Sequence, residues 1–185
     1  MPNITPIDPA QPGSAADIVA AVTAKASRIP NIFATMARSP SVLEGYLAFT
    51  GALDGGLLSP AVREQIALAV AGANQCDYCA SAHTLLARGS GVERSEAALN
   101  LEGSATEPRV DAVLKFTRAV VDSRARLPNG PGALNELRDA GVSDPEIVEI
   151  LAHIGLNLFT NYFNHVVDTD IDFPLVTTGS IRNAA

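Results

Sequence analysis

The sequence predicts an all-α protein, folded as a compact bundle of about eight helices, and three observations on the residues support this prediction. Apolar residues recur at helical spacing along most of the chain, and no segment alternates as a half-buried strand would. Proline, serine and glycine stand where helix starts and stops are expected. With 47% hydrophobic and 18% charged residues, the 185-residue chain has an ordinary globular composition. We expect one helical domain over residues 1–185.

The N-terminal residues are expected to differ from the rest. Residues 1–13 should form an extended arm, because Pro2, Pro6, Pro9 and Pro12 suppress helix formation. Helical spacing begins after Ser14, a candidate N-cap, and continues to about residue 27.

Prolines and glycines mark the next helices. Pro30 and Pro40 bracket a short helix, and the helix that follows should stop at the paired glycines 55–56, which suit a C-terminal cap. The Ser-Pro pair at 59–60 is a strong start for a helix over 61–75, because serine caps well and proline is tolerated at the first helical position.

The same kinds of residue mark the ends of the remaining helices. A break at Asn74 and Gln75 precedes a helix over 76–91, which places Cys76 near a helix N-terminus. After it we expect a short helix over 92–103, a long amphipathic one over 107–127, a Pro/Gly loop over 128–132, a short helix over 133–141, and a last long helix over 145–167 that starts at Ser143. Residues 168–185 should form an extended tail.

Composition and charge exclude several classes of function. The net charge is −7, from 13 basic and 20 acidic residues, and the basic residues are scattered singly, which argues against a nucleic-acid partner. No apolar run is long enough to span a membrane, and the N-terminus lacks the features of a secretion signal, so we expect a cytoplasmic protein. The only two cysteines lie three residues apart and cannot cross-link distant segments, so they are expected to be redox-active or metal-binding.

These cysteines belong to a group that carries chemistry. At 100° per residue, Cys76, Cys79 and His83 fall within about 60° of one another on a single helix, so the sequence predicts that they share one face. Cα atoms three residues apart on a helix also fit the ~4.4–6.8 Å range that a disulfide requires. Thiolates near a helix N-terminus are favoured by its unpaired N–H groups and positive dipole end.

His83 is the expected proton carrier, because its unperturbed pKa near 6.5 lets it remove and return a proton. A carboxylate partner must come from another helix. Glu64 is the candidate, since the preceding helix can bring it opposite the cysteine helix, and its rivals are Glu44, Asp54 and Asp77.

The run from Leu58 to Gly91, LSPAVREQIALAVAGANQCDYCASAHTLLARGSG, resembles the signature of the AhpD-like alkylhydroperoxidase and carboxymuconolactone decarboxylase family. The shared features are a Glu twelve residues before the first Cys, a C-x-Y-C motif, and a His four residues after the second Cys. Residues 29–53 and 157–174 are also similar to parts of this family. Members that decarboxylate the lactone generally lack the cysteine pair, so the resemblance implies the peroxidase branch.

The resemblance implies a role for each residue of the motif. Cys79 would be the thiolate that reacts with peroxide, and Cys76 the resolving thiol that closes a disulfide. Glu64 and His83 would relay protons, and Tyr78 would shape the site. The implied substrate is hydrogen peroxide or an organic hydroperoxide, and an external thiol reductant would restore the dithiol. The resemblance implies no cofactor, whether metal, haem or flavin, and it implies a homo-oligomer, either a trimer or a hexamer built of such units.

Other readings of the same residues stay open. The cysteines could be two buried small hydrophobes, or metal ligands together with His83 and Glu64. An enzyme alternative is a decarboxylase or isomerase of a lactone-like acid that uses His83 and Glu64 as acid and base. A further alternative is a non-catalytic thiol redox sensor.

Polar residues of the last helix are expected to have structural roles. His153 and His165 lie among apolar residues and should serve packing or an interface. A polar seam, formed by Asn157, Thr160, Asn161 and Asn164, should cap a neighbour's backbone or face a subunit, and lining a substrate pocket is the less favoured role.

The tail contains Asp168, Asp170 and Asp172 at alternate positions, a spacing that a calcium loop can show. It lacks the loop glycine and the closing Glu of such a site, so we expect instead that the tail packs on a neighbouring subunit.

Overall fold

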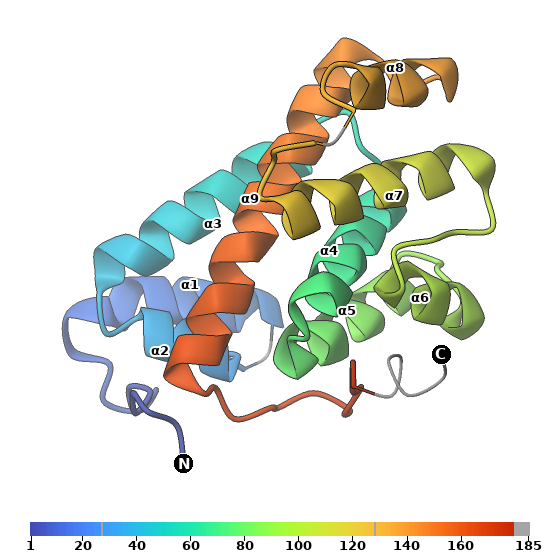
Figure 1. The fold of residues 1–185 in the computed structure, drawn as a ribbon. Coiled ribbons are helices and arrows are strands. Elements are labelled where there is room, and N and C mark those ends of the chain that lie inside the picture. Colours follow the sequence, from blue (N-terminus) through green and yellow to red (C-terminus); the bar gives the residue numbers. More distant parts are fainter. Residues whose placement is uncertain (27, 128, 180–185) are drawn as a thin grey trace.

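The computed structural model describes residues 1–26, 28–127 and 129–179. In these residues the chain forms nine α-helices and one short 3-10 helix and no strand (Figure 1), which confirms the predicted all-α class. The helices are α1 (Ala16–Ala26), α2 (Asn31–Met36), α3 (Pro40–Asp54), α4 (Pro60–Asn74), α5 (Asp77–Gly89), α6 (Arg94–Leu101), α7 (Pro108–Ser123), α8 (Gly132–Asp139) and α9 (Asp144–Val167).

Helix α4 is the centre of the bundle. It packs against α5, α6, α7 and α9, and a run of its residues from Gln65 to Ala71 is buried. Small side chains allow its neighbours to come close: a Cβ added at Gly72 would lie 1.8 Å from the carbonyl oxygen of Leu101 on α6. Only glycine therefore fits at this crossing of α4 and α6.

The apolar residues form two clusters. One joins α1, α2, α3 and α5 with parts of α4 and α6, and it contains Cys76, Tyr78 and Cys79. The other joins α4, α7, α8 and α9, with Ile66, Leu114, Ile150 and others fully or nearly fully buried. The cysteine motif thus belongs to the core of the first cluster rather than to the surface.

The expected caps explain most helix boundaries. Ser59 stands at the N-cap of α4 and its Oγ accepts the backbone N–H of Val62 at 3.3 Å, with Pro60 at the first helical position. Ser143 and Glu146 form a reciprocal capping box at the start of α9. These local signals are readable without knowledge of the tertiary structure.

Two boundaries differ from the prediction. Helix α7 ends at Ser123 rather than near residue 127, because Arg124 and Ala125 adopt left-handed conformations with φ of 55° and 61°. Gln75 is likewise left-handed (φ 58°), so the chain turns there and Cys76 is an extended N-cap residue that precedes α5. Residues 27, 128 and 180–185, which include parts of the predicted first helix, loop and tail, lie outside the described residues.

The arm and the tail both pack on the helices of their own chain. In the arm, the backbone N–H of Asn3 donates to the carbonyl of Val167 at 2.7 Å. In the tail, the N–H of Val176 donates to Ser81 Oγ at 2.9 Å. Residues 168–179 therefore pack on their own chain, where α5 presents polar groups to the tail backbone. The expected packing of the tail on a neighbouring subunit stays a prediction.

No helix within the described ranges combines the length and the apolar character needed to cross a membrane.

Candidate active site

Helices α4 and α5 bring Glu64 to His83. The Nδ1 atom of His83 lies 2.8 Å from Oε2 of Glu64, and each side chain is about one-fifth exposed, at 20% and 21%. Two rival carboxylates are engaged elsewhere: Asp54 pairs with Arg63 at 3.0 Å, and Asp77 binds the tail. With Nδ1 held by the carboxylate, Nε2 is the ring nitrogen left to exchange protons.

The two cysteines are buried free thiols, 2% and 3% exposed. Cys76 caps α5: its Sγ accepts the backbone N–H of Cys79 at 3.4 Å. A sulfur in this position faces the unpaired N–H groups and the positive end of a helix, an arrangement that stabilises a thiolate.

Cys79 is approached from α9. The Nδ2 of Asn164 donates to its Sγ at 3.3 Å, and Asn164 is itself buried, with no described partner for its Oδ1 atom. The Thr160 hydroxyl, one turn earlier on α9, also stabilises the Cys79 thiolate. Two polar side chains of α9 thus lower the pKa of a thiol on α5, and one of them, Asn164, donates a hydrogen bond to its sulfur.

The two thiols have opposite pKa shifts. The hydrogen bond with the Cys79 side chain lowers the pKa of Cys76, and the Cys79 N–H and the charge of His83 add to this effect while burial opposes it. The same hydrogen bond to Cys76, together with burial and the negative charge of Cys76, raises the pKa of Cys79. Of the two thiols, Cys76 is therefore the more readily ionised.

Cys79 and His83 open onto a common cavity of about 420 Å³. Its walls are mostly apolar and aromatic, and they include Phe33, Tyr46 and Phe173. Cys76 lines a different cavity of about 280 Å³. Cys79 and His83 thus share one cavity, whereas Cys76, the extended N-cap residue of α5, also reaches the second one while its Sγ accepts the Cys79 N–H.

Tyr78 links the tail to the N-terminal helices. Its hydroxyl donates to Oδ1 of Asp172 at 2.9 Å and accepts the backbone N–H of Ile32 at 3.2 Å. Burial, first, and then the nearby carboxylate raise the pKa of Tyr78 well above its usual range. Asp172 also binds the Arg28 guanidinium. Tyr78 is therefore a neutral residue that holds one wall of the cavity in place.

The polar seam of α9 faces inward, contrary to expectation. Thr160 and Asn164 line the cavity of Cys79, the role that the sequence disfavoured. Asn161 accepts a hydrogen bond from Asn74 on α4 at 3.2 Å. The spacing of the seam is visible in the sequence, but spacing alone does not orient α9 against α5.

The two histidines of α9 have structural surroundings. Burial lowers the pKa of His153, and Nε2 of His165 lies 3.0 Å from the carbonyl oxygen of Asn74. Both observations agree with the expected packing roles.

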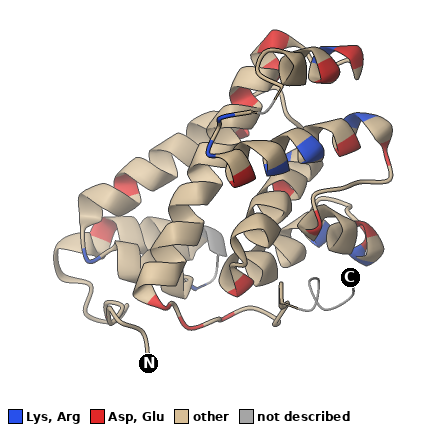
Figure 2. Ribbon diagram, in the orientation of Figure 1, with Lys and Arg blue, Asp and Glu red and all other residues tan. Residues whose placement is uncertain are grey.

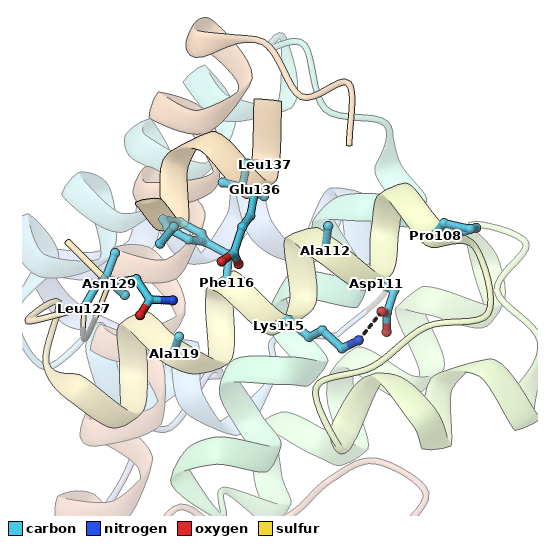
Figure 3. A pocket seen from close by; sticks show the side chains of 11 residues that line it. Pro108, Asp111, Ala112, Lys115, Phe116, Ala119, Leu127, Asn129, Glu136 and Leu137 are labelled. Carbon is cyan, nitrogen blue, oxygen red and sulfur yellow. Dashed lines mark ion pairs between the residues drawn. The ribbon is translucent and has the colours of Figure 1, made fainter. Parts of the chain in front are cut away.

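Figure 3 shows another cavity, of about 350 Å³, between α7 and α8. Its polar side chains are already paired in part, since Lys115 binds Asp111 at 2.6 Å along α7. No cysteine or histidine lines it among the described residues, so it lacks the thiol and imidazole groups found in the cavity of Cys79. Within the same described ranges, no group of three or more His, Cys, Asp or Glu side chains has a metal-binding arrangement.

Comparison with known proteins agrees with this geometry. The model of the carboxymuconolactone decarboxylase family matches residues 40–122, the segment that contains Glu64, both cysteines and His83. This segment of the chain is therefore similar to that family. None of the curated proteins matches the sequence significantly.

Solved structures of family-like proteins share the fold. A peroxidase-related protein from Ralstonia eutropha JMP134, described as an alkylhydroperoxidase AhpD core, is 25% identical over 92% of both chains, with a TM-score of 0.81. The debrominase Bmp8 is 22% identical over 92% of both chains, with a TM-score of 0.77. A peroxidase-related protein from Silicibacter sp. TM1040 is 20% identical over 91% of this chain and 92% of the other, with a TM-score of 0.76.

Proposed function

We propose that the protein is a thiol-dependent peroxidase that reduces organic hydroperoxides through a Cys76–Cys79 dithiol and disulfide cycle. The observation that carries this proposal is the position of Cys79. Its thiol opens onto an apolar cavity beside the His83–Glu64 pair, and a second thiol lies behind it, bonded to its backbone N–H. A peroxide in this cavity meets a sulfur nucleophile, a proton carrier and a resolving thiol.

In the first step, the Cys79 sulfur attacks the terminal oxygen of the hydroperoxide, and the O–O bond breaks. The Cys79 proton passes along the existing hydrogen bond to Cys76, while Asn164 and Thr160 stabilise the developing thiolate. The leaving alkoxide takes a proton from His83, which Glu64 keeps oriented. The products are an alcohol and a Cys79 sulfenic acid, so sulfur loses the two electrons that the O–O bond gains.

In the second step, the Cys76 sulfur attacks the Cys79 sulfenic sulfur, and hydroxide leaves as water with the proton from Cys76. Over both steps the singly ionised dithiol, one hydroperoxide and one proton from solvent give a disulfide, an alcohol and water. An external thiol then reduces the disulfide. The helix N-terminus favours the ionised form of Cys76 in this step.

A second candidate reaction is reductive dehalogenation of a small aromatic ring. Bmp8 has been solved as its C82A variant in complex with 2,3,4-tribromopyrrole, and it is 20% identical to this chain over 98% of it. The aromatic side chains around the cavity of Cys79 favour a flat ring as occupant. In this reaction the Cys79 sulfur would bond to bromine as the C–Br bond breaks, and the proton of the dithiol would pass to the ring carbon. The Cys76 thiolate would then attack the Cys79 sulfur and release bromide, again leaving a disulfide.

The test follows disulfide formation directly. Reduced protein is mixed with one equivalent of cumene hydroperoxide, hydrogen peroxide or tribromopyrrole, and the peptide with both cysteines is weighed by mass spectrometry. We expect loss of two hydrogens with cumene hydroperoxide, and faster reaction than with hydrogen peroxide because the cavity is apolar. Oxidation by tribromopyrrole alone would select the second candidate, and no oxidation by any of the three would refute both.

Variants separate the roles of the side chains. Cys79→Ser should abolish turnover, whereas Cys76→Ser should complete one attack and stop at a sulfenic acid that dimedone traps. His83→Ala should slow turnover by roughly 10²- to 10⁴-fold. Glu64→Gln should also slow turnover, because it removes the carboxylate that orients His83. The matched control is Glu44→Gln, at an exposed position, which should leave the rate unchanged. Full peroxidase activity in Cys79→Ser would overturn the proposal.

A further inference from the structure

The outer face of α9 carries an unbroken apolar stripe. Its exposed members are Val148, Leu151, Gly155, Phe159, Tyr162 and Val166. The two end valines are 67% and 71% exposed. The sequence has no Asp, Glu, Lys or Arg from residue 150 to residue 167, and Figure 2 accordingly draws most of α9 in tan. His165, the other exposed residue of this stretch, is bonded through its ring to α4.

Such a face is unusual for a helix at the surface. The solvent side of a surface helix ordinarily carries charged and polar residues. Single exposed apolar residues need no explanation, but a contiguous apolar strip marks an interaction site. The stripe members are separated by three or four residues throughout, which is the spacing of a coiled-coil seam.

We propose that this stripe joins two copies of the chain, with their α9 helices antiparallel about a twofold axis near residue 157. In a twofold interface, residue i of one copy contacts residue j of the other, and residue j of the first copy contacts residue i of the second, so each contact occurs twice. The register then pairs residues whose numbers sum to about 314. This proposal stands on α9 alone and does not depend on the peroxidase reaction.

The sizes of the paired side chains fit this register. Val148 meets Val166 of the second copy, Leu151 meets its Tyr162, and Gly155 meets its Phe159. A Cβ added at Gly155 would have no atom within 4 Å, so the space beside this glycine is open for the ring of Phe159. A parallel pairing would instead oppose Phe159 to Phe159 and Gly155 to Gly155.

The stripe supplies part of the area of a standard interface, and exposed apolar residues beside it extend it. From Val148 to Val166 a helix is about 27 Å long and about 10 Å wide, which offers roughly 300 Å². A standard interface needs about 800 Å² per partner. Phe49 on α3 is 44% exposed and extends the apolar surface beside the stripe. It lies one turn from Tyr46, whose ring centroid is 6.3 Å from the ring centroid of Phe159. Leu57 is 61% exposed and lies near the Val148 end of the stripe, where its N–H donates to Glu149.

The charge around the stripe does not oppose the pairing. The nearest carboxylate, Glu149, accepts backbone N–H groups of Leu57 and Leu58 at 2.7 Å and 3.2 Å. It is therefore turned toward its own chain. The two stripes can meet without burying an unpaired charge, which would otherwise cost several kcal/mol.

The test is a charge-pair rescue measured by sedimentation velocity from about 1 to 100 μM protein. Val148→Glu and Val166→Lys should each weaken association at least about 100-fold, because each buries an unpaired charge. The double variant V148E/V166K should recover to within about tenfold of the wild type, since each introduced carboxylate then faces the introduced ammonium group of the other copy. Circular dichroism shows that each variant is folded.

The control is Leu99→Lys, which places a charge on an exposed apolar residue of α6, away from the stripe, and should leave association unchanged. A wild-type chain that is monomeric at 100 μM would overturn the proposal. A double variant no stronger than the single ones would overturn the antiparallel register. If the wild type forms a larger assembly, Val148→Glu should reduce its mass, and an unchanged mass would refute the role of α9.

Discussion

Replacement of Asn164 by Leu isolates the contribution of α9 to thiol reactivity. The Asn164 amide donates to Cys79 Sγ at 3.3 Å, and its carbonyl oxygen has no described partner although the residue is only 4% exposed. Leucine has a similar volume but neither polar atom. The change therefore removes one hydrogen bond to the sulfur and one unsatisfied acceptor at the same time.

The size of the effect follows from these two contacts. A hydrogen bond to a charged group is worth about 1.5–3 kcal/mol, so its loss should raise the pKa of Cys79 by about 1–2 units. The rate of attack on peroxide should fall about 10- to 100-fold, since each ~1.36 kcal/mol is a factor of ten. The free energy of unfolding should change little, because removal of the unsatisfied carbonyl offsets the lost bond.

The assay is dithiothreitol-dependent reduction of cumene hydroperoxide, together with urea unfolding of the reduced protein. Asn157→Leu is the matched control: Asn157 lies on the same helix, is buried, and bonds only the backbone carbonyl of His153 at 2.9 Å. The control should lose stability but keep its rate per folded molecule. A folded Asn164→Leu variant within twofold of the wild-type rate would refute the role that we assign to this amide.

Three further predictions concern the thiols, the tail and the core. Cys79→Ala should raise the pKa of Cys76, because it removes the main cause of its depression, so absorbance at 240 nm should rise at higher pH than in the wild type; an equal or lower midpoint contradicts this. The depressed pKa also means that the stabilisation from the Cys76 thiolate is present above its unfolded pKa and is lost as pH falls through the folded pKa. Tyr78→Phe should cost about 1–3 kcal/mol in urea unfolding, because a buried N–H loses its acceptor, and a loss below ~0.5 kcal/mol argues against the link. Gly72→Ala should cost about 3 kcal/mol or more, or prevent folding, since its Cβ would lie 1.8 Å from the Leu101 carbonyl oxygen; a wild-type melting temperature would contradict that contact.

Features that depend on neighbouring residues in the sequence were predictable. The Ser-Pro start of α4, the capping box of α9 and the N-terminal position of Cys76 all follow from short-range hydrogen bonds that the local sequence determines. Glu64 was singled out among four carboxylates, and the structure places it against His83 because α4 and α5 are adjacent and joined by a short turn.

Features that depend on the packing of distant segments were not predictable from spacing. Asn164 lies 85 residues from Cys79, and Asp172 lies 94 residues from Tyr78, so no local pattern relates them. A break at Asn74 and Gln75 was expected, but the left-handed backbone of Gln75 that makes it was not. A non-glycine residue in that conformation has only a weak sequence signature.

Different segments of the chain supply different walls of the Cys79 cavity, and this affects how substrate preference can change between related proteins. The family match covers residues 40–122, which hold both cysteines, Glu64 and His83. Part of the remaining wall comes from α9 and from the tail, which supply Thr160, Asn164, Asp172 and Phe173 and, like Phe33 of α2, lie outside that match. Substitutions in those two segments can alter which molecule enters without touching the motif. Relatives with the same motif can therefore act on different compounds, and activity should be assigned from the last thirty or so residues of the fold as much as from the cysteines.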